Sequence, residues 1–272
     1  MIKFELTSKF KLCFGKKLFQ IRALVSFANV KEGELGGWIE KEENLSHYGD
    51  AWVYGDARVY GNAQVYGNAQ VYGNAQVYGD AQVYGNAQVY GDARVYGDAW
   101  VYGDARVYGN AQVYGDARVY GDAWVFDERH ILLVGPVGSR LAYTTFFRDA
   151  DREITVSCGC FFGKLDSFLV EVTKTHGDNR HAQIYRMAAE MAKLHIDTES
   201  NILDLKPGDK VQIISKEKND STRNYDKDME MYLGSVMTVA NIYNSGAIME
   251  EDHGKWFWNY FRIEKKVEEG EA

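Results

Sequence analysis

The sequence predicts a mainly β protein whose central part is a coil of short strands joined by tight corners. Two observations carry this prediction. Residues 48–125 repeat every six positions as Val-Tyr-Gly-(Asp/Asn)-Ala-(Gln/Arg/Trp), and the segments on both sides contain stretches in which apolar and polar residues alternate. A helix is excluded for the repeat, because each regularly spaced glycine would cost it about 1 kcal/mol.

Within each repeat, valine and alanine are the expected inward side chains, while glycine and the following Asp or Asn turn the chain. The pattern covers about 78 residues, with thirteen glycines and thirteen tyrosines in register. It resembles the hexapeptide repeats of left-handed parallel β-helices, in which three hexapeptides make one triangular coil. This resemblance implies a left-handed parallel β-helix of about four coils over residues 48–128.

Three hexapeptides per coil sort the variable sixth residue of each repeat onto three faces, none of which carries a single chemistry. The first face carries Trp52, Gln70, Gln88, Arg106 and Trp124, the second Arg58, Gln76, Arg94 and Gln112, and the third Gln64, Gln82, Trp100 and Arg118. The tyrosine after each valine is expected to point outward and to stack on the next coil. Two interpretations of these tyrosine rows stay open, a solvent-facing ladder or a subunit interface.

Residues 1–47 predict an N-terminal β cap that begins with a hairpin around Gly15. The string Gly-Glu-Leu-Gly-Gly-Trp-Ile-Glu at 33–40 leads into the first coil. It resembles the cap of hexapeptide-repeat proteins encoded by phages and by Firmicutes. A β-helix needs such a plug, because its first coil otherwise has an unpaired edge and an open core.

Residues 129–200 predict a small α+β domain, which resembles a module associated with phage hexapeptide-repeat proteins. Strands are expected at 130–134, 143–147 and 154–160, followed by a helix that starts near Leu165 and ends at Gly177. Asn179 is expected to cap a second helix. The predicted apolar side of that second helix consists of Ile184, Met187, Ala188, Met191 and Leu194.

The ligand-binding site is predicted in this α+β domain, around a loop at 135–140 that reads Gly-Pro-Val-Gly-Ser-Arg. Such a loop offers backbone N–H groups, a hydroxyl and a guanidinium, which suit a phosphate or a carboxylate. It lacks the patterns of a P-loop and of a dinucleotide fingerprint. An ordinary turn followed by helix caps is the alternative. The predicted ligand-binding residues are Gly135, Gly138, Ser139, Arg140, Thr144, Thr145, His176, Asn179 and Arg180.

No catalytic residue, metal site or cofactor is predicted. Acyltransferases built on the same helix carry a catalytic histidine between subunits, whereas residues 48–129 contain no histidine. An acyltransferase that uses His47 or His130 as its base is therefore the least favoured alternative. Cys158 and Cys160 lack the four ligands of a structural zinc site and are expected to pack as small hydrophobic residues. A nucleophile formed by one of them with His176 is the other interpretation.

Residues 203–266 predict a third domain, which resembles an SH3-like β-barrel. Its signals are a turn at Pro207-Gly208-Asp209, strands at 210–214 and 234–239, and the aromatic run that includes Trp256 and Trp258. These two tryptophans belong either to the barrel core or to a surface that docks a protein partner. Residues 267–272 are predicted to be an acidic tail.

Composition limits the classes of partner. A net charge of −8 and a pI near 5.3 argue against nucleic acid and anionic membranes. The chain start shows no signal-peptide pattern, and three cysteines fit a reducing cytoplasm.

The sequence thus predicts a non-enzymatic homo-oligomer, preferably a trimer, encoded by a phage and acting in the host cytosol. It would capture a phosphate-bearing small molecule such as a nucleotide immune signal. A structural scaffold that docks proteins is the alternative.

Overall fold

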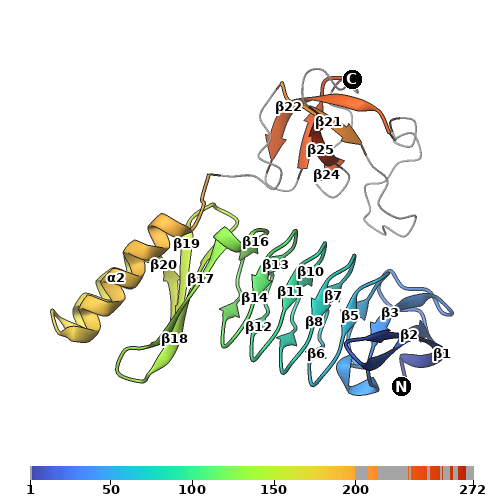
Figure 1. Ribbon diagram of the computed structural model, residues 1–272, viewed down its shortest axis with the longest axis horizontal. Coiled ribbons are helices and arrows are strands. Elements are labelled where there is room, and N and C mark those ends of the chain that lie inside the picture. Colours follow the sequence, from blue (N-terminus) through green and yellow to red (C-terminus); the bar gives the residue numbers. More distant parts are fainter. Residues whose placement is uncertain are drawn as a thin grey trace. The chain divides into compact units, whose positions relative to one another are not determined.

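The computed structural model describes residues 2–199, 208–213, 232, 234–243, 246–251, 253, 258–259 and 263–267. They belong to two compact units, Met1–Thr198 and Glu199–Ala272. The first unit contains the N-terminal cap, the repeat and the α+β segment together. The cap and the α+β segment are thus built onto the two ends of the repeat (Figure 1).

The repeat forms a parallel β-solenoid with three sheets (Figure 1). Strands 18 positions apart pair in register, so that Gln70 lies opposite Gln88. The repeat valines are fully buried and the alanines are at most 1% exposed, which confirms the inward positions. One sheet stacks five strands. The strands are β4 (Trp52–Val53), β5 (Arg58–Val59), β6 (Gln64–Val65), β7 (Gln70–Val71), β8 (Gln76–Val77), β9 (Gln82–Val83), β10 (Gln88–Val89), β11 (Arg94–Val95), β12 (Trp100–Val101), β13 (Arg106–Val107), β14 (Gln112–Val113), β15 (Arg118–Val119) and β16 (Trp124–Val125).

The corners of the solenoid require glycine for two reasons. Every repeat glycine has a positive φ, for example +71° at Gly67. A Cβ atom on Gly67 would also lie only 3.0 Å from the backbone nitrogen of Gly85 in the next coil. The dihedral angle and the close stacking of the coils therefore exclude larger residues at these corners.

The tyrosines stack in columns along the outside of the solenoid, as predicted. The rings of Tyr72 and Tyr90 are 4.7 Å apart and 2° from parallel. Where the next coil carries glutamine, a hydroxyl group can bond to it, as Tyr66 Oη does by donating to Gln82 Oε1 at 3.0 Å. These contacts tie each coil to the next one, whereas the role of the columns as a subunit interface stays a prediction.

The N-terminal cap continues one sheet of the solenoid. The hairpin of β1 (Phe4–Cys13) and β2 (Lys16–Ala23) is antiparallel, β2 pairs with β3 (Leu35–Ile39), and β3 lies parallel to β5 of the first coil. The short 3-10 helix η1 (Glu42–Asn44) follows. Strand β3 therefore covers the edge of β5 that the first coil would otherwise expose, and the antiparallel hairpin extends the sheet beyond β3.

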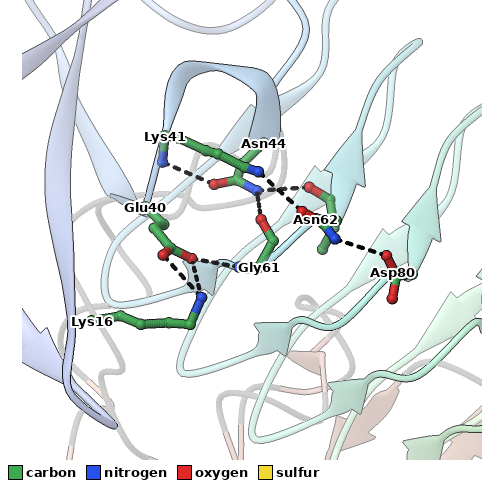
Figure 2. A network of polar contacts seen from close by, with 8 residues as sticks. Lys16, Glu40, Lys41, Asn44, Gly61, Asn62 and Asp80 are labelled. Atoms are coloured by element: carbon green, nitrogen blue, oxygen red, sulfur yellow. Dashed lines mark hydrogen bonds and ion pairs between the residues drawn. The ribbon is translucent and has the colours of Figure 1, made fainter.

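Polar side chains of the cap complete the bonding of the first coil (Figure 2). The amide of Asn44 donates to the carbonyl oxygens of Gly61 at 3.1 Å and of Ala63 at 2.8 Å. The carboxylate of Glu40 accepts from the Gly61 N–H at 2.7 Å and from Lys16 Nζ at 2.7 Å. The Asn44 amide therefore takes the place of the backbone donors of a preceding coil, whereas Glu40 adds an acceptor for the Gly61 N–H.

The α+β segment closes the other end of the solenoid. Its four strands form an antiparallel meander in the order β17-β18-β19-β20, preceded by the 3-10 helix η2 (Glu128–His130). One sheet face continues the solenoid core through Ile131 and Phe147. The two helices cover the opposite face, around Phe146 and Phe168. The elements are β17 (Ile131–Val137), β18 (Ala142–Arg148), β19 (Ile154–Cys158), β20 (Phe161–Lys164), α1 (Leu165–His176) and α2 (Arg180–His195).

Two predicted boundaries in this segment are wrong. The apolar run does not end at Val134, because β17 extends to Val137, and the predicted loop at 135–140 shrinks to a turn at 138–141. The strand predicted at 154–160 ends at Cys158, and a fourth strand, β20, follows it. Both boundaries are set by hydrogen bonding to the neighbouring strand. The apolar runs of a sequence do not show where such pairing ends.

The predicted apolar side of α2 is wrong for Met187, Met191 and Leu194 and is confirmed for Ala188. The buried face is formed by Ala182, Tyr185, Ala188, Ala189 and Ala192. The predicted core residues Met187, Met191 and Leu194 are 67%, 53% and 90% exposed. Small alanine side chains let the helix approach the sheet closely, so hydrophobicity alone selected the wrong side.

The second unit contains a five-stranded antiparallel sheet in the order β24-β23-β22-β21-β25. Its strands are β21 (Lys210–Ile213), β22 (Val236–Tyr243), β23 (Gly246–Met249), β24 (Trp258–Asn259) and β25 (Ile263–Val267). The strands predicted near 210–214 and 234–239 are present, and the SH3-like barrel stays a prediction. Trp258 lies in β24, while Pro207, Trp256 and residues 268–272 lie outside the described residues.

Candidate ligand-binding site

The two adjacent threonines of the predicted site do not face a common ligand. Successive residues of a strand point to opposite faces, and Thr144 and Thr145 are neighbours in β18. Thr145 lies against the solenoid, where its Oγ1 accepts from the Arg118 N–H at 3.1 Å. Thr144 lies on the side of the helices. Thr145 is therefore part of the cap and not of a ligand site.

Three further predicted residues form no side-chain hydrogen bond with the other predicted site residues in the described structure. Asn179 caps α2, because its Oδ1 accepts from the Ala182 N–H at 3.0 Å. Arg180 is exposed in the first turn of α2. Gly135 lies within β17, and a Cβ there would come within 2.7 Å of the Tyr143 ring. Helix capping and strand packing account for Asn179 and Gly135 without a ligand.

The other predicted residues come together around Tyr185, which the sequence analysis did not include. The turn glycine Gly138 has φ +74°, and a Cβ on it would lie 1.9 Å from the Tyr185 hydroxyl oxygen. The hydroxyl thus lies directly against the backbone of the predicted loop. The His176 ring centre is 5.7 Å from that of Tyr185. We call Gly138, Arg140, Thr144, Cys158, His176, His181 and Tyr185 the Tyr185 cluster.

A chain of polar groups connects β18, β19 and α2 in this cluster. Thr144 Oγ1 donates to Cys158 Sγ at 3.2 Å, and the Cys158 side chain also influences the ionisation of Tyr185. Burial, reinforced by Cys158, raises the pKa of Tyr185 to about 12, against an opposing effect of Arg140. Tyr185 is therefore a neutral hydroxyl at physiological pH.

Arg140 supplies the positive charge of the cluster. It is exposed, and its Nη1 lies 3.4 Å from where a Cβ on Gly159 would be, so the guanidinium lies beside the turn between β19 and β20. Within the described parts of the chain, Arg140 forms no ion pair. Ser139, also exposed, precedes it in the same turn. A guanidinium in this state is free to bind an anion.

Two histidines of the Tyr185 cluster lie at the corner between α1 and α2. Their ring centres, in His176 and His181, are 5.9 Å apart. The Nδ1 atom of His181 is buried and has no hydrogen-bond partner among the residues that the structure describes. His181 and Tyr185 are four positions apart on one helix, and this spacing was the signal in the sequence that could have revealed them.

The cysteines differ from their prediction. Cys158 is half-buried and hydrogen-bonded, whereas Cys160 is exposed in the turn, so the prediction that both pack in the interior is wrong for Cys160. No group of three His, Cys, Asp or Glu side chains that could hold a metal ion occurs in the described ranges.

The two histidines considered as bases have structural contacts at opposite ends of the solenoid. His47 Nδ1 accepts from the Lys3 N–H at 3.1 Å. His130 is buried, its Nδ1 accepts from the Phe126 N–H at 3.4 Å, and burial lowers its pKa to about 4. Each histidine therefore completes backbone bonding next to a cap.

These features define a β-solenoid repeat protein with a folded cap at each end of its coil. The repeat matches the family model of the YdcK beta solenoid repeat at residues 51–67, 63–79, 69–85, 87–103 and 111–126. These matches lie within the solenoid and include neither the Tyr185 cluster nor the second unit. No curated protein matches the chain. Neither helix of the described structure is long and apolar enough to cross a membrane.

Proposed function

We propose that this protein is a non-enzymatic binding protein that captures a phosphate-bearing small molecule at the Tyr185 cluster. The observation that carries the proposal is Arg140, an exposed guanidinium without an ion pair in the described structure. It lies beside the turn between β19 and β20, two residues after Gly138, whose backbone lies against the Tyr185 hydroxyl. Guanidinium groups, hydroxyls and backbone N–H groups are the usual partners of phosphate oxygens. Ser139 and His176 would add donors at the edge of the site.

The solenoid would serve as a rigid carrier in this function. Its valines and alanines form the core, its glycines the corners and its tyrosines the columns, so the repeat has little chemistry left for catalysis. We expect a left-handed coil and a homo-oligomer, with a trimer favoured, formed along the tyrosine columns. Several copies of a weak site would then act together and bind with avidity.

The finer identity of the ligand follows from the resemblance of the cap and the α+β segment to phage hexapeptide-repeat proteins. A phage protein in the host cytosol that captures a phosphate compound would act as a sponge for a nucleotide immune signal. The second unit, as an SH3-like barrel with Trp256 and Trp258, would add a protein contact.

The test compares two arginines of the same domain. We expect isothermal titration calorimetry to detect binding of adenosine diphosphate or of a cyclic dinucleotide, and Arg140→Ala to weaken it at least tenfold. Arg180→Ala is the matched control, because Arg180 lies outside the cluster. Native mass spectrometry of protein purified from bacterial cytosol would reveal a retained ligand as extra mass on each subunit. The proposal fails if no phosphate compound binds, or if both variants lose binding equally.

A scaffold that docks proteins is the second candidate function, and the exposed side of α2 favours it. Met187, Met191 and Leu194 form an apolar stripe at helical spacing, and Leu194 is 90% exposed. A pair of substitutions, Met191→Lys and Leu194→Lys, should abolish cross-links to a partner protein in cells and leave phosphate binding unchanged.

A further inference from the structure

The tip of the N-terminal hairpin exposes large apolar side chains at the free end of the cap. Phe10, Leu12 and Phe14 are 49%, 70% and 85% exposed. They are two positions apart, which places Phe10 and Leu12 on one face of β1 and Phe14 at the turn next to them. Such a protruding apolar surface lowers the solubility of the molecule and contributes nothing to its core.

The turn itself makes Phe14 more unusual. Phe14 has φ +48° and the following Gly15 has φ +80°, the pair of positive angles of a two-residue hairpin turn that favours Asn-Gly. A bulky residue at a positive φ is an outlier. Phe14 is therefore unfavourable both for the backbone and for contact with water, and stability gives no reason for its presence.

Charge is segregated around this tip. Residues 6–27 contain four lysines and one arginine but no acidic residue, in a chain of net charge −8. Lys11, Lys16 and Arg22 pair with carboxylates elsewhere in the cap and first coil. Lys9 and Lys17 form no ion pair with any described residue, and their Nζ atoms lie over the rings of Trp38 and Phe10 at 5.5 and 4.8 Å.

We propose that this hairpin tip binds an anionic lipid surface, with Phe10, Leu12 and Phe14 in the interface and Lys9 and Lys17 at the headgroups. Exposed apolar side chains beside cations that form no ion pair with the described residues are the pattern of interfacial anchors. A symmetric contact with a second copy is disfavoured, because it would bring two positive tips together. The net negative charge of the protein does not prevent the binding, since salt screens the repulsion between the anionic surface and acidic residues more than about 10 Å away from it.

Vesicle flotation of the full chain tests the proposal. We expect at least tenfold more protein bound to vesicles of phosphatidylcholine and phosphatidylglycerol than to phosphatidylcholine alone. Phe14→Asn should reduce binding about tenfold and yet raise the melting temperature, because asparagine tolerates a positive φ. A purely structural role of Phe14 would move both properties in the same direction. Leu194→Ser, which removes an equally exposed side chain from α2, is the control and should bind normally.

The charge requirement has its own pair of variants. The double variant Lys9→Glu and Lys17→Glu should abolish the preference for the anionic vesicles, while Lys174→Glu on α1 should retain it. Arg140→Ala should also bind vesicles normally, which separates this proposal from phosphate capture. The proposal of lipid binding is overturned if the natural protein binds neither kind of vesicle or if the control variants lose as much vesicle binding as the test variants. It is also overturned if Phe14→Asn instead changes the oligomeric mass in solution.

Discussion

The two ends of the solenoid are closed by different chemistry. In each coil the N–H of the variable residue donates to an alanine carbonyl of the next coil, as Gln70 does to Ala87 at 2.9 Å. The first coil therefore leaves alanine carbonyls unpaired, and the last coil leaves N–H groups unpaired. The N-terminal cap accordingly contributes donors, namely Lys3 Nζ to Ala51 and the Asn44 amide to Ala63. The C-terminal cap contributes an acceptor, the hydroxyl of Thr145.

The ends also differ in how they bury the core. A whole sheet face, with Phe147 and Ile131, closes the C-terminal end of the solenoid. At the N-terminal end, Lys3 is only 3% exposed, and burial lowers its pKa to about 8. Both ends close the core with apolar side chains, among them Phe4, Ile21 and Val30 at the N-terminal end, but only the N-terminal cap adds a buried lysine that donates to the coil. A parallel coil therefore has a direction, which the polar groups of its caps must match.

The largest expected effect concerns the apolar sheet face that closes the C-terminal end of the solenoid. Phe147→Ala should destabilise the protein by about 4 kcal/mol, because it opens a cavity between the sheet and the last coil. Urea denaturation followed by circular dichroism measures the change. Phe162→Ala is the control, since Phe162 is 43% exposed and should cost about 1 kcal/mol. Equal losses in the free energy of unfolding for the two variants would show that the sheet face does not close the solenoid core.

The N-terminal cap should lose stability when a single side-chain donor is removed. Asn44→Leu leaves the carbonyls of Gly61 and Ala63 without their side-chain partner and should cost about 3 kcal/mol. Asn62→Ala removes an exposed ladder contact to Asp80 and should cost less than about 0.5 kcal/mol. If Asn44→Leu were as stable as the natural protein in thermal melts, the conclusion that the N-terminal end needs side-chain donors would be wrong.

The smallest expected effect is a pH dependence at the C-terminal end. The pKa of His130 is about 4 in the folded protein and 6.5 in the reference state, so the unfolded chain binds the proton more readily. The contribution of neutral His130 to stability is complete above pH 6.5 and is lost as the pH decreases toward 4. Melting curves of the natural protein and of His130→Asn at pH 7.5 and 4.5 measure this, and an identical pH response would contradict it.

Parts of the candidate site were predictable and parts were not. Gly138 and Arg140 were identified from the chemistry of their loop, and His176 from its corner between helices. Thr145 was wrongly included, although the alternation of a strand already separates it from Thr144. Tyr185 was missed, because the rotation of α2 on the sheet depends on how closely its alanines pack. Cys158 was considered only as a packing residue or a nucleophile and not as a neighbour of Thr144. No periodicity in the sequence reports that distance.

The sequence by itself determined the solenoid, including which residues share each face. Every sixth residue has the same role and every eighteenth stacks on its equivalent, so local corners and repeated bonding leave one solution. Only the tertiary structure decided that the α+β segment is a cap of this coil and that Tyr185 lies against Gly138. Those contacts join residues far apart in the chain, and their energy comes from the fit of surfaces that exist only after folding.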